Sequence, residues 1–338
     1  MTDRYRLIGS TASPYALKMR SLLRYRRIAF DWVIMTPELR RATAHLRPML
    51  IPVLQYPDGI YRNETSALTR DLEQRHVGRS VIPDRPGIAF LSDLIEDFSD
   101  EWVVKPLFLY RWWDPEDQAY VSRWGAEEWS VFEPGLTRDE IVEQFRQRQV
   151  SRMPILGVTR ENYDLLAESY KRVLRACEPH VGIGRFIFGT RPSIADLALY
   201  GQLSELGSDP TPLKIMRDIA PFTDHWVRRA DDLSGVDGAW QSAQEGISQW
   251  AIDLLRIVGE LYLPFLTANE KAFRDERQRL EISAWGLPYV LAPFKYQVKC
   301  LAALRSSFAA LDENERKSVT PVLEATGCLP YLILGSRL

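Results

Sequence analysis

The chain has 338 residues, a length that suggests two domains or three small ones. Hydrophobic residues make up 46% and charged residues 26%, which is typical of a folded globular protein and excludes a disordered one. The longest stretch without Asp, Glu, Lys or Arg covers 13 residues, from Ile282 to Phe294, whereas a membrane helix needs roughly 18. We therefore expect no membrane partner and, because the first residues show no signal-peptide pattern, a cytoplasmic protein.

Charge is distributed unevenly along the chain. The 43 basic and 45 acidic residues give a net charge of −2, but residues 1–80 hold 14 basic and 7 acidic residues, a net charge of +7. The remaining 29 basic and 38 acidic residues therefore give −9. A basic module of this size could attract nucleic acid or hold a small anionic ligand, and the motifs described below favour the ligand.

Cysteine and histidine patterns exclude several kinds of site. Cys177, Cys300 and Cys328 form no CxxC pair, so we expect reduced thiols and neither a disulfide framework nor a zinc site. The four histidines have no metal-ligand spacing, and the motifs GxGxxG, GxxxxGK[ST], GxSxG and HExxH do not occur. We therefore expect no metal, and nucleotide-binding, serine-hydrolase and zinc chemistry have no support.

The first eighty residues predict alternating strands and helices. In chain order the pattern indicates strands over 5–8, 30–35, 52–56 and 60–61, and helices over 14–27, 37–46 and 66–76. A tight turn at Pro57-Asp58-Gly59 separates the two short strands. The resulting order, βαβαββα, is that of a thioredoxin-like domain.

Two helix N-termini and a proline-led strand are expected at one edge of this sheet. Ser13 and Pro14 open the first helix, since Ser is a preferred N-cap and Pro is tolerated at the first helical position. The acid and hydroxyls of Glu64-Thr65-Ser66 open the last helix. Ile51-Pro52 opens a strand, and an X-Pro bond of this kind can be cis.

Three motifs in this region, taken together, resemble the glutathione S-transferase family in order and spacing. They are Ser13-Pro14-Tyr15, Ile51-Pro52-Val53-Leu54 and Glu64-Thr65-Ser66-Ala67-Leu68. A fourth motif, from Gly189 to Asp196, resembles the start of the central helix of the family's second domain, where Asp196 completes a capping box with Ser193. We interpret Asp196 as structural, and the resemblance covers roughly residues 4–110 and 160–235.

The resemblance implies a glutathione site on the N-terminal domain, with glutathione as co-substrate. Ser13 is then the catalytic residue, which stabilises the glutathione thiolate through its hydroxyl, and Ser10 and Thr11 are alternative donors. The thiolate is the nucleophile, and a helix N-terminus with a hydroxyl donor lowers a thiol pKa from its usual value of ~8.5. The alternative interpretation of Ser13 is a helix cap and nothing more.

The resemblance also assigns residues that bind the tripeptide. Ile51 pairs with the cysteinyl backbone and Pro52 fixes that edge, while Glu64 and Thr65 bind the γ-glutamyl ammonium and carboxylate. Structural interpretations of these residues are a strand-edge proline, a first-turn acid and a cap. The group that binds the glycyl carboxylate is left open among four basic residues, which are Arg40, Arg41, His45 and Arg47.

The remainder of the chain is predicted to be helical. The expected fold is an α/β thioredoxin-like N-terminal domain over 1–82, an all-α C-terminal domain over 87–235 and a helical extension over 236–338, without later strands. Two apolar stripes at helical spacing, one ending near Pro264, lie in the extension. We expect them to pack on the C-terminal domain.

An aromatic-rich insertion is expected near 110–160. Half of the ten tryptophans lie between residues 102 and 129. Because the resemblance implies that this region overhangs the glutathione sulfur, Trp102, Tyr110 and Trp113 are candidate residues of a substrate pocket. The alternative is that these rings pack in the core or at a dimer interface.

The sequence, with this resemblance, predicts a glutathione transferase in which bound glutathione thiolate attacks a hydrophobic, aromatic electrophile. The alternatives are glutathione-dependent ether or halide cleavage, and a non-catalytic binding protein with the same fold. The resemblance implies a homodimer. Nucleic acid is not an expected partner, because no concentrated basic stretch surrounds the aromatic residues.

Overall fold

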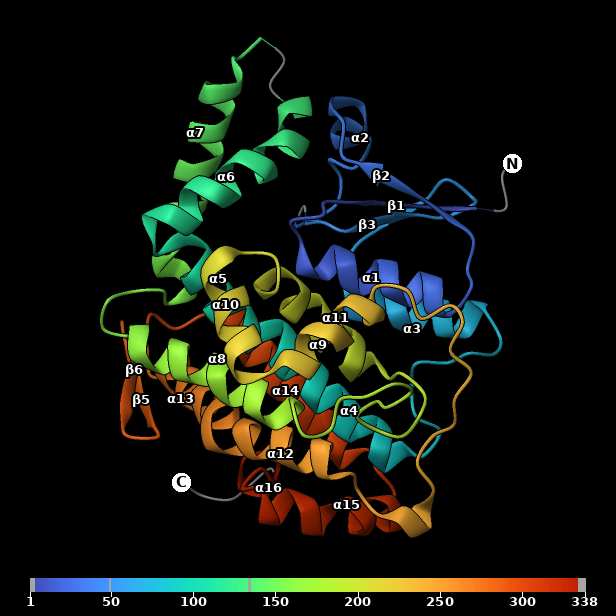
Figure 1. The fold of residues 1–338 in the computed structure, drawn as a ribbon. Helices are drawn as coiled ribbons and strands as arrows, with labels where there is room; N and C mark the ends of the chain where they lie inside the picture. The colour runs from blue at the N-terminus through green and yellow to red at the C-terminus, as the bar shows by residue number, and fades with distance from the viewer. Residues whose placement is uncertain (1–3, 49, 133–134, 334–338) are drawn as a thin grey trace.

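The computed structural model describes residues 4–48, 50–132 and 135–333 (Figure 1). Residues 1–3, 49, 133–134 and 334–338, which fall within the predicted domains, lie outside the described residues. Of the described helices, none has both the length and the apolar character that crossing a bilayer requires.

The N-terminal part is a four-stranded mixed sheet covered on both faces by helices (Figure 1). Its elements are β1 (Tyr5–Gly9), α1 (Pro14–Tyr25), β2 (Phe30–Ile34), α2 (Pro37–Ala42), β3 (Val53–Gln55), β4 (Tyr61–Arg62) and α3 (Thr65–Arg75). The strand order is β2-β1-β3-β4, with β1 and β2 parallel and β3 antiparallel to both β1 and β4. This confirms the predicted βαβαββα order and the thioredoxin-like class.

Helices dominate from residue 86 onward. Up to residue 230 they are α4 (Pro86–Phe98), η1 (Ser99–Val103), α5 (Val104–Trp112), α6 (Pro115–Trp129), η2 (Ser130–Phe132), α7 (Arg138–Val150), η3 (Pro154–Leu156), α8 (Tyr163–Cys177), α9 (Ile194–Leu206), α10 (Pro210–Ile219) and α11 (Pro221–Ala230). The extension then contains η4 (Ala243–Glu245), α12 (Gln249–Ile257), η5 (Val258–Tyr262), α13 (Leu263–Arg274), β5 (Leu280–Ala284), β6 (Leu287–Leu291), α14 (Lys295–Ala309), α15 (Glu313–Ala325) and α16 (Leu329–Leu332). Helices α6 and α7 form an arm that rises beside the N-terminal sheet (Figure 1).

Two expectations for the extension were wrong. Strands β5 and β6 form an antiparallel hairpin where none was expected, and its turn residues Trp285 and Gly286 both have positive φ (56° and 77°). Pro288 is tolerated because a two-stranded hairpin has only edge strands. Pro264 does not end the helical run either, because it lies in the first turn of α13, directly after the wide turn η5 that accommodates it.

Helix α1 joins the sheet to the helical part. A Cβ atom on Gly201 of α9 would lie 2.4 Å from the Pro14 carbonyl oxygen, so the two backbones touch. The buried Lys18 Nζ donates to the carboxylates of Glu96 and Asp100, at 2.6 Å each. Burial opposes the charged form of Lys18, but the two carboxylates outweigh it and raise the pKa of the lysine.

The extension shares the hydrophobic core of the other helices. Buried residues from α4 to α16 belong to one continuous cluster. Phe90 of α4 packs on Phe308 of α14, with ring centroids 5.3 Å apart. The Tyr262 hydroxyl donates to Asp97 of α4 at 2.6 Å. Both contacts involve α4, the helix that also carries Glu96, one of the two partners of Lys18.

A second lysine is buried in this core without a carboxylate partner. Lys105 is 2% exposed, and its Nζ lies 5.9, 5.2 and 6.0 Å from the ring centroids of Trp102, Phe265 and Tyr289. Within the described ranges it forms no ion pair, and its one recorded hydrogen bond is a 3.5 Å contact to the Leu156 carbonyl. Burial lowers the pKa of Lys105 to about 8.

Replacing Gly201 with alanine should separate α1 from α9. The added methyl overlaps the Pro14 carbonyl, so we expect Gly201→Ala to lower the free energy of unfolding by about 2 kcal/mol, measured by chemical denaturation. Gly235→Ala is the matched control, because a Cβ there meets nothing within 4 Å. Equal stability of the two variants would contradict the tight contact.

Lys105 should make stability rise with pH. Its pKa is about 8 in the folded protein and 10.5 in the reference state, so the unfolded chain binds more protons between these values and unfolding becomes harder as pH rises through them. We expect Lys105→Met to be more stable at neutral pH and to lose this rise, which is about 3 kcal/mol in full and about 2 kcal/mol between pH 7 and pH 9.5. Denaturation curves between about pH 7 and pH 9.5 check this, with the exposed Lys299→Met as control. Parallel pH profiles of wild type and Lys105→Met would contradict it.

Candidate functional site

Three chain segments meet at one edge of the N-terminal sheet. Strand β1 ends at Gly9, and its neighbour Ile8 pairs with Val53 at the start of β3. The cis peptide Ile51–Pro52 directly precedes this point. Strand β4 runs antiparallel to β3 and therefore ends at the same edge, where α3 begins at Thr65. The predicted site residues of this domain are thus gathered at one end of the sheet.

Ser13 is the N-cap of α1. Its Oγ accepts a hydrogen bond from the Ala16 N–H at 3.3 Å, and the side chain is buried. Among the described residues no group accepts a hydrogen bond from the Ser13 hydroxyl. Ser10 Oγ accepts from the Ala12 N–H at 3.1 Å. The cap interpretation of Ser13 is therefore realised, and its hydroxyl still has a proton to donate in front of the positive end of α1.

Thr11 is bound by the helical arm. Its N–H donates to Glu128 Oε2 of α6 at 2.9 Å, and its hydroxyl donates to Glu128 Oε1 at 2.6 Å. Because the Glu128 carboxylate accepts both hydrogen bonds, the Thr11 hydroxyl is already engaged as a donor. Glu128 was not among the predicted site residues, because it lies among other acids on α6 and no sequence pattern distinguishes it.

A second anchor of the same loop comes from the helical core. Arg111 Nη1 donates to the Ala12 carbonyl at 3.3 Å. The buried guanidinium is fixed by Asp209 and Glu205, each at 2.6 Å, and it lies 5.5 Å from the ring centroid of Trp124. The loop that carries Ser13 is therefore held by two elements of the helical part.

The start of α3 is strained and uncapped. Glu64 has φ 73° and ψ 103°, an unfavourable conformation for a residue with a side chain, and its carboxylate makes no capping bond. Strain of this kind clusters at binding sites. Thr65 is buried, and its hydroxyl has no partner among the described side chains and backbone groups. The positive end of α3 is thus available to a carboxylate.

Acidic side chains of α4 and η1 surround this helix start. Ser66 Oγ donates to Glu96 at 2.6 Å. Burial raises the pKa of Asp97 to about 7 and that of Glu101 to about 8, and the negative charges of neighbouring carboxylates, Glu64 among them for Glu101, add to the second shift. A cation placed beside these carboxyl groups, such as an ammonium group, would favour their charged forms and be attracted by them.

The candidate glycyl-end residues have local partners. Arg41 forms an ion pair with Glu38 at 3.3 Å, and His45 Nδ1 lies 3.1 Å from the Ala42 carbonyl. Arg47 donates to the backbone carbonyls of Ala44 and Leu46. The side chain of Arg40, on α2, is exposed.

The three predicted pocket residues pack inside the helical part. Trp102 has no exposed surface and contacts the rings of Phe265 and Tyr289, with centroids 5.2 Å apart in both pairs. Tyr110 is 6% exposed and packs on Tyr170, and Trp113 packs on Tyr163. Their aromatic partners all lie on helices of the helical part or on the β5–β6 hairpin. None of these ring contacts connects the three residues with the edge of the N-terminal sheet where Ser13 and Thr65 lie. Core packing, the alternative in the sequence analysis, describes Trp102 and Tyr110.

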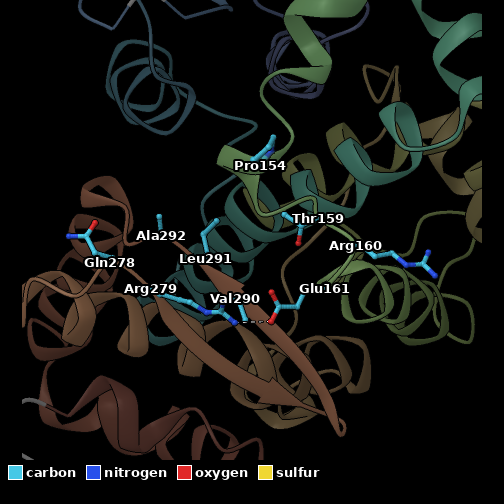
Figure 2. Close-up of a pocket in the computed structure, with 9 residues that line it drawn as sticks. All are labelled: Pro154, Thr159, Arg160, Glu161, Gln278, Arg279, Val290, Leu291 and Ala292. Carbon is cyan, nitrogen blue, oxygen red and sulfur yellow. Dashed lines mark hydrogen bonds and ion pairs between the residues drawn. The ribbon is translucent and has the colours of Figure 1, made fainter.

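An open hollow of about 430 Å³ lies elsewhere, between the β5–β6 hairpin and the segment that precedes α8 (Figure 2). It is lined by Pro154, Thr159, Arg160, Glu161, Gln278, Arg279, Val290, Leu291 and Ala292. A 2.8 Å ion pair between Glu161 and Arg279 crosses it. It includes no predicted site residue. Over the described part of the chain, no group of three or more His, Cys, Asp or Glu could hold a metal ion.

Comparison with known proteins identifies the N-terminal part. Residues 7–80 match the family model for the glutathione S-transferase N-terminal domain, which confirms the resemblance for this segment. No match was found among curated proteins. Among solved structures the chain is similar to a glutathione S-transferase from Methylobacterium radiotolerans in complex with glutathione sulfonate, with 20% identity, 71% of this chain and 97% of that chain covered, and a TM-score of 0.43.

Two further solved structures are similar. One is a GST-like protein from Pseudomonas syringae, with 20% identity, 68% of this chain and 67% of that chain covered, and a TM-score of 0.44. The other is a beta-etherase from Sphingobium sp., with 15% identity, 67% of this chain and 93% of that chain covered, and a TM-score of 0.46.

Removing the Glu128 carboxylate should free the loop that carries Ser13. In Glu128→Ala the Thr11 N–H loses its charged acceptor, so we expect its amide hydrogen to exchange about tenfold faster. Hydrogen exchange followed by NMR measures this. Glu127→Ala is the control, because Glu127 instead faces the exposed Arg138 at 3.8 Å. An unchanged exchange rate in Glu128→Ala would show that the contact does not hold the loop.

Proposed function

Because residues 7–80 form a glutathione S-transferase N-terminal domain, we propose that the chain is a glutathione transferase that binds glutathione at this sheet edge. The observation that carries the proposal is the meeting of the α1 start, the Ile51–Pro52 peptide and the strained, uncapped start of α3. Such an edge offers two positive helix ends and a free backbone edge to a small anionic peptide.

In the proposed reaction the glutathione thiolate attacks an electrophilic carbon. The sulfur–carbon bond forms as the bond to the leaving group breaks, the leaving group takes the electron pair, and the thiol proton goes to solvent. Ser13 donates its hydroxyl proton to the sulfur, and with the positive end of α1 it lowers the thiol pKa. The buried cap position supports this assignment, since it fixes the Ser13 rotamer.

The tripeptide is held by the other predicted residues. Ile51 and Pro52 present the backbone edge to the cysteinyl residue. The uncapped start of α3 at Thr65 receives the γ-glutamyl carboxylate, and the Glu64 carboxylate, with Glu101 of η1 nearby, receives the ammonium. The family resemblance extends the proposal to a homodimer acting in the cytoplasm on a hydrophobic electrophile.

Ser13→Ala tests the catalytic assignment. We expect the conjugation rate to fall about 100-fold, while calorimetry shows glutathione affinity almost unchanged. Since the variant also loses a helix cap, worth about 1 kcal/mol, Ser248→Ala serves as control. Ser248 caps α12 through the Ala251 N–H at 3.1 Å and lies outside the N-terminal domain.

Two results would overturn parts of the proposal. An unchanged rate in Ser13→Ala would move the thiol-stabilising role to Ser10 or to no side chain, because Thr11 already donates to Glu128. If the wild-type protein is not retained on immobilised glutathione and shows no thermal shift with free glutathione, glutathione binding itself is wrong. Binding without conjugation of any electrophile would support a non-catalytic protein.

A further inference from the structure

Two arginines stand one helical turn apart where the α6–α7 arm returns to the helical core. The Arg148 guanidinium lies 5.1 Å from the ring centroid of Trp129 on α6, and that of Arg152 lies 5.7 Å from the ring of Phe108 on α5. Both arginines are exposed, and both rings are partly buried. Each ring covers one face of a guanidinium and leaves the N–H edge to meet a ligand.

Neither guanidinium pairs with a carboxylate of the described residues. Among the residues that the structure describes, Arg148 and Arg152 form no ion pair with a carboxylate, and the one side-chain partner recorded for them is Gln149, at 3.3 Å from Arg152. The other two arginines of α7 differ, because Arg146 pairs with Glu143 at 2.7 Å and Arg138 faces Glu127 at 3.8 Å. Unpaired positive charge is therefore concentrated at the end of α7.

The two arginines of this cluster repel each other. Partial desolvation of the guanidinium, together with the positive charges of Arg152 and of Arg40 on α2, lowers the pKa of Arg148. An anion placed between Arg148 and Arg152 would relieve this repulsion.

The cluster adjoins the loop that carries Ser13. Trp129, which stacks on Arg148, follows Glu128, whose carboxylate binds Thr11. A continuous line of contacts therefore runs from Arg148 through Trp129 and Glu128 to the β1–α1 loop. A ligand with its reacting group at Ser13 could extend an acidic group toward the cluster.

We propose that Arg148 and Arg152 form a carboxylate-binding site that belongs to the reaction centre. The proposal rests on the proposed function for its reactants. The carboxylate has two possible sources, the glycyl end of glutathione or an acidic group on an aromatic electrophile. Paired guanidinium groups suit a carboxylate because they offer parallel N–H donors, and the partly exposed Trp129 and Phe108 rings suit an aryl group.

The test uses the double variant Arg148→Gln/Arg152→Gln. The control is Arg138→Gln, which removes one positive charge from the other end of α7. One pair of reactants is glutathione and its glycyl ethyl ester, and the other is 4-(chloromethyl)benzoate and its methyl ester. We expect the double variant to lose about tenfold in kcat/KM for the free acid of one pair, with its ester and the Arg138→Gln protein unchanged. The pair that responds identifies the source of the carboxylate.

A direct binding measurement separates this proposal from the proposed function. Calorimetry with 2-naphthoate and with neutral 2-methylnaphthalene needs no glutathione, so the carboxylate site can be supported even if glutathione fails to bind. We expect about tenfold weaker naphthoate binding in the double variant and recovery in Arg148→Lys/Arg152→Lys, which keeps both charges. If the double variant does not fold, Arg152→Gln alone replaces it. Equal naphthoate affinity in the wild-type and variant proteins, with no preference for either free acid, would overturn the proposal.

Discussion

The position of α1 determines what the sheet edge presents, because this helix packs on the sheet and on the helical part at once. Two features fix it. Gly201 lets the α9 backbone approach Pro14 without an intervening side chain, and Lys18 places a buried positive charge between Glu96 and Asp100. Loss of one partner of such a pair costs about 3–5 kcal/mol. Since Ser13 caps the same helix, its distance from the helical part is set by packing rather than by the loop.

The charge asymmetry of the sequence has a structural meaning that composition alone did not reveal. The positive charge of the first eighty residues was expected to serve an anionic ligand. In the structure Arg20 and Arg24 of α1 both pair with Asp231, at 2.6 Å each, and Arg79 pairs with Asp237. Part of the positive charge thus binds the acidic helical part, and complementary charge helps to orient the two parts on each other.

Local signals predicted the N-terminal domain because each acts within a few residues, as Ser13 and Pro14 do at the start of α1. They could not predict contacts between distant segments, and Thr11 and Glu128 are 117 residues apart. Nor does a sequence report backbone strain, so the positive φ of Glu64 could not be predicted. The surroundings of the aromatic residues could not be predicted for a related reason: Trp102 packs on Phe265 and Tyr289 of the extension, and Tyr110 packs on Tyr170 of α8, all far away in the sequence.

The stacking of Trp129 under Arg148 has a spectroscopic consequence. Indole emission depends on the charge and the water near the ring, and Trp129 and Trp124 both lie under arginines of the helical part that faces the β1–α1 loop. Trp102 and Trp112, by contrast, are buried among other aromatic rings, where a ligand would not reach them. The chain therefore contains its own optical reporter, because an anion beside Arg148 changes the field at Trp129 while the core tryptophans supply a constant background.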